Sequence, residues 1–402
     1  MRNIFQFLII VFCLFSSSNP LLAQWVQTSG TNSDTVECIA VSGSNLYAGT
    51  YDGGSLLLST NNGASCTTTN IGLTNDPIGA VFVLSTNLFA AAHDGVYVST
   101  NKGTSWKYMG LAYDDAVAFA VCGTNLFAGT ISAGVFLSTD VGASWTSVNN
   151  GLTNTAVRAL AVIDTSLFAG TWGGVFVSTN SGTSWIDGST ILSIHVLSLA
   201  VCGGNLFAGT DGGIFLSTNN GASWTKVNTG LTNNYVKALA VFGTNLFAGT
   251  NGGVFLSTNS GTTWTAVNTG LTNTVIMCLA ISDTTLFAGT YGGGICRRPL
   301  SEMVTAVKEN DGSVPKSFGL EQNYPNPFNP STKISYQLPV NCRATLKIYD
   351  ALGRELATLV NDNESAGYKS VVFDASNLSS GVYFYRLQAG TYSQTKKLLL
   401  LK

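Results

Sequence analysis

Short apolar runs alternate with polar turns along most of the chain, and the pattern returns about every 40 residues. Each period contains four runs with the composition of β-strands, separated by turns rich in Gly and Asn. In one period these runs are residues 238–241, 245–250, 254–257 and 263–267. The block Leu-Phe-Ala-Gly-Thr, or a near copy, ends at positions spaced 38 to 42 residues apart: Thr50, Ala92, Thr130, Thr171, Thr210, Thr250 and Thr290. Four strands in a period near 40 predict the blades of a β-propeller.

The fourth run of each period shows how the ring closes. It carries a Trp in five periods and Cys66 in the first, at positions Trp106, Trp145, Trp185, Trp224 and Trp264. The seventh period ends at Pro299 without such a run, whereas residues 24–28 carry a spare one, in phase with the repeat. We therefore predict a seven-bladed propeller over residues 24–299, in which the N-terminal strand pairs alongside residues 294–298. This pairing removes two open edges that favour aggregation. The alternative is an open solenoid, in which a strand displaced from the last repeat to the N-terminus would have no role.

The two ends of the chain differ from the repeats. Residues 1–23 begin with a basic residue, continue through an apolar run and end in small residues, which is the order of a signal peptide. We expect cleavage after Ala23; a buried N-terminal helix is the alternative. Residues 300–317 are charged and free of repeats, which predicts a linker, and the alternating strands of residues 318–402 predict a small Ig-like β-sandwich. The fold class is therefore all-β.

Composition excludes several classes of protein. Charged residues make up 10% of the 402 positions and the formal net charge is −2, so the chain lacks the basic face of a nucleic-acid-binding protein. An apolar content of 45% with little charge also argues against disorder. No later apolar run reaches the length of a membrane-spanning helix, so we expect no transmembrane segment after signal cleavage.

Cysteine and histidine give no sign of a metal centre. One of the eight Cys lies in the expected signal peptide, and the odd remainder at irregular spacing is not a disulfide framework. Cys38 and Cys278 occupy equivalent positions in neighbouring blades, as a disulfide bridge or as two buried thiols. No CxxC pair is present, so no zinc site is predicted. His93 and His195 lie three blades apart, and we interpret each as a solvated or hydrogen-bonded loop residue, not as a metal ligand.

A ligand is expected on the face where the loop between the second and third strands of each blade meets the loop from the preceding blade. Exposed aromatic side chains there can stack on sugar rings or contact a protein, and they can also simply cover loop backbone. Blade two departs most from the repeat: its carboxylates Asp94, Asp114 and Asp115 can bind Ca²⁺ through hard oxygens, serve as general acid and base, or reflect sequence drift. The candidate ligand-binding residues are Tyr51, Asp52, His93, Asp94, Tyr113, Asp114, Asp115, Trp172, Asp211, Asn251 and Tyr291. No catalytic residue, no metal ligand and no other cofactor is assigned.

The turn before each Trp carries a family resemblance. It reads Ser-Thr-Asp-Val-Gly-Ala-Ser-Trp at residues 138–145 and Ser-Thr-Asn-Asn-Gly-Ala-Ser-Trp at residues 217–224. This resembles the Asp-box of the BNR-repeat propellers, which include sialidases, sortilin-like receptors, xyloglucanases and photosystem II assembly factors. The Asp is replaced here in five copies, at Asn61, Asn101, Asn180, Asn219 and Asn259. We expect a structural turn in which Asn or Asp bonds its own backbone and tolerates left-handed geometry, Gly takes a positive φ, and Trp packs as an anchor.

The C-terminal segment carries a second and more specific resemblance. Its features are the QNYPNPFNPST block at residues 322–332, the YDALGRE turn at 349–355, the SSGVYFYRL strand at 379–387 and a basic-ended tail. Residues 318–402 closely resemble the type A sorting domain of the type IX secretion system of Bacteroidota. The resemblance implies export to the periplasm, passage through the outer membrane, and a partner in the type IX secretion machinery. The protein is then secreted or displayed at the outer-membrane surface.

The sialidase chemistry is missing from the propeller. Sialidases hold a carboxylate with three Arg and use a Tyr–Glu nucleophile pair, whereas residues 24–300 hold only Arg158, Arg297, Arg298 and a single Glu, Glu37. No other catalytic motif is present. The leading prediction is a non-catalytic propeller that binds a glycan or a surface protein. The alternatives are a glycoside hydrolase-like enzyme with carboxylates on the loop face, and a structural surface component.

Overall fold

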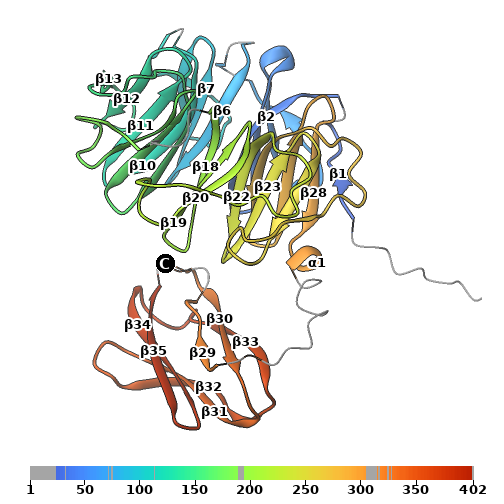
Figure 1. The fold of residues 1–402 in the computed structure, drawn as a ribbon, viewed down its shortest axis with the longest axis vertical. Helices are drawn as coiled ribbons and strands as arrows, with labels where there is room; N and C mark the ends of the chain where they lie inside the picture. The colour runs from blue at the N-terminus through green and yellow to red at the C-terminus, as the bar shows by residue number, and fades with distance from the viewer. Residues whose placement is uncertain are drawn as a thin grey trace, which may run out of the picture. The chain divides into compact units, whose positions relative to one another are not determined.

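The computed structural model describes residues 24–31, 33–70, 72–73, 76–112, 114–188, 194–304, 315, 317–323, 326 and 328–400. The expected signal peptide lies outside these residues. The chain divides into two compact units, with the boundary between residues 306 and 307. The first unit consists of seven four-stranded antiparallel sheets (Figure 1), which confirms the predicted seven-bladed propeller.

Each blade runs from a first strand to a fourth. The first strands are β2 (Val36–Ser42), β6 (Ile78–Leu84), β10 (Ala116–Cys122), β14 (Val157–Ile163), β18 (Val196–Cys202), β22 (Val236–Phe242) and β26 (Ile276–Ile281). The second strands are β3 (Asn45–Thr50), β7 (Asn87–Ala92), β11 (Asn125–Thr130), β15 (Ser166–Thr171), β19 (Asn205–Thr210), β23 (Asn245–Thr250) and β27 (Thr285–Thr290). First strands of neighbouring blades contact one another all the way round, including β26 with β2, so the ring is closed.

The outer half of each blade is shorter. The third strands are β4 (Leu56–Ser59), β8 (Gly95–Ser99), β12 (Gly134–Ser138), β16 (Gly174–Ser178), β20 (Gly213–Ser217), β24 (Gly253–Ser257) and β28 (Ile295–Pro299). The fourth strands are β5 (Thr67–Thr68), β9 (Lys107–Tyr108), β13 (Thr146–Ser147), β17 (Ile186–Asp187), β21 (Thr225–Lys226) and β25 (Thr265–Ala266). The helix η1 (Asp52–Gly54) lies between β3 and β4.

The N-terminal strand β1 (Val26–Gln27) supplies the fourth strand of blade seven. It pairs antiparallel with β28, with Val26 opposite Arg297 and Gln27 opposite Cys296. Figure 1 shows the blue β1 beside the orange β28. The last blade is therefore built from both ends of the propeller sequence, and β28 has a partner on each side.

Trp25 anchors this closing segment. Its side chain is 3% exposed and packs in the core of blade seven, and its Nε1 donates a hydrogen bond to the backbone oxygen of Val267 at 2.7 Å. Four residues later, Ser29 forms a β-bridge with Ser65 in blade one. The N-terminal segment thus contacts blade seven through β1 and blade one through Ser29.

The Gly of the repeated Leu-Phe-Ala-Gly-Thr block is explained by the packing of one blade on the next. A Cβ on Gly289 would lie 2.8 Å from Cγ1 of Val36, the first residue of β2. That distance is too short for two carbon atoms, so the close approach requires Gly. Blade two has Ala91 instead, and the first residue of the next blade is Ala116, where the other blades have Val or Ile. Part of the divergence of blade two is therefore a compensating exchange of side-chain size.

The turn before each Trp is held by its own side chains. In blade three, Asp140 Oδ1 accepts hydrogen bonds from the Ser144 backbone and the Ser138 hydroxyl, both at 2.8 Å, and Ser138 Oγ accepts one from Gly142 N at 2.7 Å. The same bonds recur in the five turns with Asn61, Asn101, Asn180, Asn219 and Asn259. One expectation is corrected: left-handed geometry falls on the following residue, here Val141 with a φ of 58°, because the Asn or Asp side chain needs ordinary backbone geometry to reach forward.

The start of the segment predicted as a linker packs with the propeller. The short helix α1 (Ser301–Val304) follows β28, and Leu300 and Met303 are buried in the core of blade seven. Arg298 Nε lies 3.7 Å from Glu302 Oε2. Residues 305–314 and 316 lie outside the described part of the chain.

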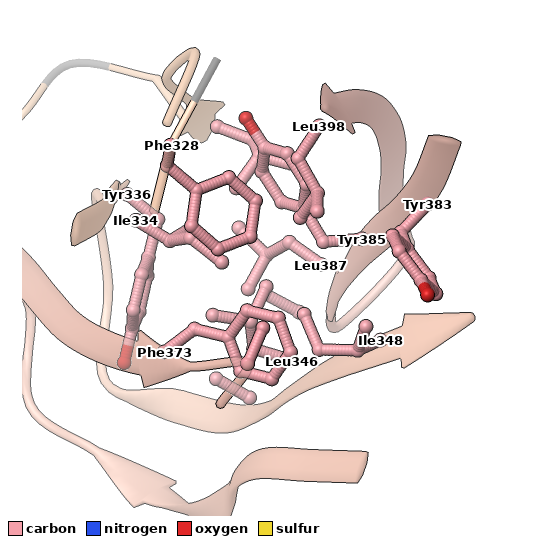
Figure 2. Close-up of a cluster of buried hydrophobic side chains, with 14 of the residues drawn as sticks. Phe328, Ile334, Tyr336, Leu346, Ile348, Phe373, Tyr383, Tyr385, Leu387 and Leu398 are labelled. Atoms are coloured by element: carbon pink, nitrogen blue, oxygen red, sulfur yellow. The ribbon is translucent and has the colours of Figure 1, made fainter. Parts of the chain in front are cut away.

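The second unit is an antiparallel sandwich. One sheet contains β29 (Gly319–Leu320), β30 (Ser331–Leu338) and β33 (Gly367–Asp374), and the other contains β32 (Glu355–Glu364), β31 (Cys342–Tyr349), β34 (Gly381–Ala389) and β35 (Tyr392–Leu400). This agrees with the predicted Ig-like β-sandwich. Figure 2 shows the buried side chains that form its core, among them Phe328, Ile334, Tyr336, Leu346, Ile348, Phe373, Tyr385, Leu387 and Leu398.

The QNYPNPFNPST block serves this core. Asn323 is 1% exposed, its Nδ2 donates to Thr332 Oγ1 at 2.9 Å, and its backbone N–H donates to Tyr385 Oη at 2.8 Å. The backbone N–H of Phe328 donates to the Leu399 oxygen at 2.9 Å. The block therefore connects β30 of one sheet with β34 and β35 of the other, which explains why its residue types are so specific.

Candidate binding site

The first strands of the propeller surround a cavity of about 940 Å³. The second residue of every first strand lines it, and we term these seven residues the channel ring: Glu37, Gly79, Val117, Arg158, Leu197, Lys237 and Met277. The shared position has a structural cause. In all seven blades the register between the first and second strands shifts by one residue between the first and third residues of the first strand. The second residue is thus the extra residue of a β-bulge and is left out of the ladder.

The channel ring holds every charged side chain of the seven first strands. These are Glu37 on β2, Arg158 on β14 and Lys237 on β22. Glu37 is also the only Glu between residues 24 and 300. The strands β14 and β22 flank β18, so the two cations belong to blades four and six and the carboxylate belongs to blade one. In a propeller with so few charges, this convergence is the main chemical feature of the cavity.

Burial affects the charged groups of the ring. It raises the pKa of Glu37, and the positive charges of Lys237 and Arg158 oppose that shift. Burial lowers the pKa of Lys237, and Glu37 opposes that shift in turn. Within the described part of the chain, none of the ion pairs closer than 4.0 Å joins these three residues to any partner. They therefore influence one another through the cavity without direct contact.

Aromatic rings, not carboxylates, lie against the two cations. The Arg158 guanidinium carbon lies 5.4 Å from the ring centre of Trp172, within the range of a cation–π contact. Lys237 Nζ lies 5.8 Å from the ring centre of Tyr235 and 2.9 Å from Met277 Sδ. Arg158 Nε is buried and has no hydrogen-bond partner. Both cations thus keep unused capacity to bind an anion.

The loops at the mouth of the cavity contain several predicted residues. Tyr51, His93 and Asp115 line the cavity. The Nδ1 of His93 pairs with Asp115 Oδ1, and the Nδ1 of His195 lies 3.0 Å from Asp211 Oδ2. Both His are therefore hydrogen-bonded loop residues, as the sequence suggested.

Aromatic side chains are exposed at these loops. Tyr51 is 57% exposed, Trp172 47% and Tyr291 61%, and Trp172 also packs against the ring of His195 at 5.4 Å between centres. Tyr235, which the sequence did not single out, is 39% exposed and lines the cavity. We term Tyr51, Trp172, Tyr235 and Tyr291 the aromatic rim. Asn251 is exposed at the equivalent loop position of blade six.

Two other predicted carboxylates, Asp52 and Asp94, accept hydrogen bonds from groups of their own blades. Asp52 accepts a hydrogen bond from the Thr35 backbone at 3.3 Å, and Asp94 accepts one from the Tyr97 hydroxyl at 2.5 Å. Asp114 does not line the cavity, and Tyr113 lies outside the described residues. In the part of the chain that the structure describes, no three His, Cys, Asp or Glu side chains gather as a metal site. Asp94, Asp114 and Asp115 do not form such a group among the described residues: Asp94 bonds to Tyr97, and Asp115 pairs with His93.

Cys38 and Cys278 are free thiols that line the cavity. Each donates a weak hydrogen bond to the next blade, Cys38 Sγ to the Ile78 oxygen and Cys278 Sγ to the Val36 oxygen, both at 3.4 Å. Burial raises the pKa of Cys38 to about 12 and that of Cys278 well above its usual value. Of the two possibilities left open by the sequence, the structure has the buried thiols.

Sequence reasoning considered only loops and missed the channel ring. Glu37, Arg158 and Lys237 each directly follow the buried residue that begins a first strand, so they share one repeat position. Aligning the seven repeats on that position would have grouped them. That alignment does not by itself show that the first strand is the innermost strand, which only the closed ring establishes.

Comparison with known families concerns the second unit. Residues 322–401 match the family model described as the secretion system C-terminal sorting domain. The C-terminal unit is a secretion-system sorting domain. The protein is thus handled by the type IX secretion system and is secreted or displayed at the cell surface. Among the described residues, no helix has the length and apolar character needed to cross a membrane.

Solved structures similar to the chain are β-propellers. The extracellular domain of the putative one component system BT4673 from B. thetaiotaomicron is 18% identical with a TM-score of 0.59, over 84% of this chain and 48% of that one. YCF48 bound to D1 peptide is 14% identical with a TM-score of 0.57, and the match covers 69% of this chain and 97% of YCF48. The GH74 enzyme of Niastella koreensis is 20% identical with a TM-score of 0.51, and the match covers 67% of this chain and 43% of the enzyme.

These structures share the fold at low identity. The chain spans about half the length of the BT4673 domain. No curated protein matches the sequence.

Proposed function

We propose that the exported propeller is a non-catalytic carbohydrate-binding module whose ligand lies on the aromatic rim. The observation that carries this proposal is the placement of exposed aromatic side chains around the mouth of a cavity of about 940 Å³. Exposed aromatic rings on a soluble protein are costly to leave in water and mark binding surfaces. The flat apolar faces of sugar rings suit them, and the polar loop backbone between them suits sugar hydroxyls.

The state of the carboxylates supports binding over hydrolysis. A glycoside hydrolase needs two carboxyl groups on either side of the scissile bond, one to protonate the leaving group and one to act as base or nucleophile. Around the mouth, Asp52, Asp94, Asp115 and Asp211 are each hydrogen-bonded within the loops. They are thus used to shape the rim. The sialidase clamp is also missing, since Arg158 is the only Arg on a first strand.

The export route completes the proposal. A signal peptide at residues 1–23 delivers the chain to the periplasm, and the sorting domain then directs it through the outer membrane. The propeller resembles the BNR-repeat family in its turns, and YCF48, which shares the fold, is bound to a peptide in its structure. For this chain we propose a polysaccharide outside the cell.

The test measures binding by the mature protein, residues 24–402, on an array of glycans, followed by calorimetric titration with the best oligosaccharide. Tyr51→Ala or Tyr291→Ala is expected to lower affinity by a factor of about 5–10, which corresponds to the loss of one aromatic contact. Tyr368→Ala is the matched control, because Tyr368 is 56% exposed but lies in the sorting domain.

Three outcomes would contradict the proposal. Release of reducing sugar that is lost in Asp115→Asn would establish an enzyme. Concentration-dependent self-assembly seen by light scattering, with no glycan bound, would favour a structural surface component. Equal effects of Tyr51→Ala and Tyr368→Ala would show that the rim is not the binding surface.

A further inference from the structure

The charged residues of the channel ring are unexpected in a propeller with so little charge. Arg158 and Lys237 are the only basic residues on the seven first strands, while the other five between residues 24 and 300 lie elsewhere: Lys102, Lys107, Lys226, Arg297 and Arg298. Taking a cation out of water costs free energy unless an anion or a set of acceptors compensates it. Within the channel ring, Glu37 is the one carboxylate that faces the two cations; Asp115, which also lines the cavity, pairs with His93. The formal charges of the ring, two positive and one negative, therefore leave an excess of one positive charge.

The two cations of the ring lie on the same side of the cavity. The strands β14, β18 and β22 belong to three consecutive blades, so Arg158 and Lys237 are separated by one blade. Glu37 on β2 belongs to blade one, on the other side of the ring. The side formed by blades four to six therefore presents a guanidinium and an ammonium group to the cavity.

These donors suit a particular chemistry. A planar guanidinium binds a carboxylate through two parallel hydrogen bonds, and an ammonium group adds a point charge. The contacts with Trp172 and Met277 leave this capacity free, because neither partner carries a negative charge.

We propose that the cavity binds a carboxylate of an acidic sugar residue through Arg158 and Lys237, so that the carbohydrate held on the aromatic rim is a uronate-containing polysaccharide. This inference rests on the proposed function, because the rim is what makes the ligand a carbohydrate. The aromatic rim contacts the uncharged faces of the sugar rings. The cavity selects a polysaccharide in which one of the sugars carries a carboxylate. Glu37 is a positioning residue: its charge opposes the incoming carboxylate and limits affinity.

The test compares matched oligosaccharides on the full mature protein: a galacturonate trisaccharide and the corresponding galactose trisaccharide, titrated calorimetrically at low salt. We expect the acidic probe to bind at least 10-fold more tightly. Arg158→Gln and Lys237→Gln each remove a charged hydrogen-bond donor and are expected to weaken binding of the acidic probe by about 10- to 100-fold. Arg158→Lys keeps the charge but not the planar fork, and it is expected to fall between the native protein and Arg158→Gln. Glu37→Gln is expected to tighten binding.

The outcomes separate this inference from the proposed function. Equal affinity for the acidic and neutral probes, unchanged in Arg158→Gln and Lys237→Gln, would overturn the carboxylate site while leaving carbohydrate binding intact. Absence of binding to either probe and to the whole array would overturn both. Binding of an acidic peptide without any oligosaccharide, lost in Arg158→Gln, would overturn the carbohydrate assignment in favour of a protein ligand. Far-ultraviolet circular dichroism checks that each variant is folded, and Lys237→Gln tests the idea independently if Arg158→Gln does not fold.

Discussion

Replacement of Trp25 by Ala tests how the ring is closed. The side chain is 3% exposed in the core of blade seven, and removing a buried Trp typically costs about 3–5 kcal/mol. The lost hydrogen bond adds little, because Arg298 also donates to the Val267 oxygen at 3.1 Å and leaves that acceptor satisfied. For a domain of this size, such a loss lowers the melting temperature by about 6–20 °C.

The consequence at Trp25 should exceed simple loss of packing. Trp264 is the matched control: it is also 3% exposed, and its Nε1 donates to the Val227 oxygen at 2.8 Å. Its strand is continuous with the rest of blade six on both sides. The strand that follows Trp25, β1, has no short connection to β28 and is held beside it by strand pairing and by the packing of Trp25, so Trp25→Ala is expected to release β1 and open the edge of β28.

Calorimetry and hydrogen exchange measure the two effects. In the calorimeter, the transition of the sorting domain serves as an internal reference, since Trp25 does not belong to that unit. By hydrogen exchange, β28 is expected to lose protection in Trp25→Ala and to keep it in Trp264→Ala. A cost below about 1 kcal/mol for Trp25→Ala, with β28 still protected, would refute the account of closure.

Four further predictions concern other parts of the molecule. Gly294→Ala is expected to cost well over about 1 kcal/mol in chemical denaturation, because φ is 67° and a Cβ would overlap the Thr31 oxygen. Hydrogen bonds, chiefly from Ser144, lower the pKa of Asp140 to about 2, below its value in the unfolded chain. The ionised Asp140 therefore stabilises the fold above about pH 4, and this contribution is lost as the pH falls towards 2. Melting curves over this range should show less acid sensitivity in Asp140→Asn. Burial raises the pKa of Cys38, so a thiol reagent at pH 8 should modify it only after unfolding. Deletion of residues 318–402 should leave the propeller in the periplasm, as detected by cell fractionation.

Each of these has a result that would contradict it. Gly43→Ala is the control for Gly294→Ala, because Gly43 also has a positive φ but has open space around its Cβ position; equal costs would show that the contact with Thr31 is unimportant. Identical acid transitions in Asp140→Asn and the native protein would remove the proposed pH effect. Rapid labelling of native Cys38 would show that the first strands open readily. An extracellular propeller without its last domain would show that export does not depend on that domain.

The sequence predicts the fold because each blade repeats the same order of four strands and the same turns. The phase of Trp25 relative to the later Trp positions indicates a closed ring, and the alternation of residues 331–338 indicates the sandwich. The divergence of blade two needed the structure. The sequence leaves this divergence open between drift and function, because the contact between Ala91 and Ala116 joins different blades and cannot be seen along the chain.

The candidate site was predicted in part. Tyr51, His93 and Asp115 line the cavity, as expected for loops on one face. The charges of Glu37 and Arg158 were noted only as counts of residue types. Their convergence depends on a bulge, and a one-residue shift in strand pairing leaves no trace in a pattern of short apolar runs.

The extra residue in each first strand has an evolutionary consequence. Because it takes no part in the ladder, it can change without altering the strand pairing that supports the blade. Within this single chain the seven equivalent positions already hold seven different residue types, from Gly to Arg, while the residue before each is always Val, Ile or Ala. Substitutions here should therefore cost little stability, close to the ±0.5 kcal/mol typical of surface changes. A propeller of this design can acquire a new selectivity one residue at a time while its scaffold stays the same.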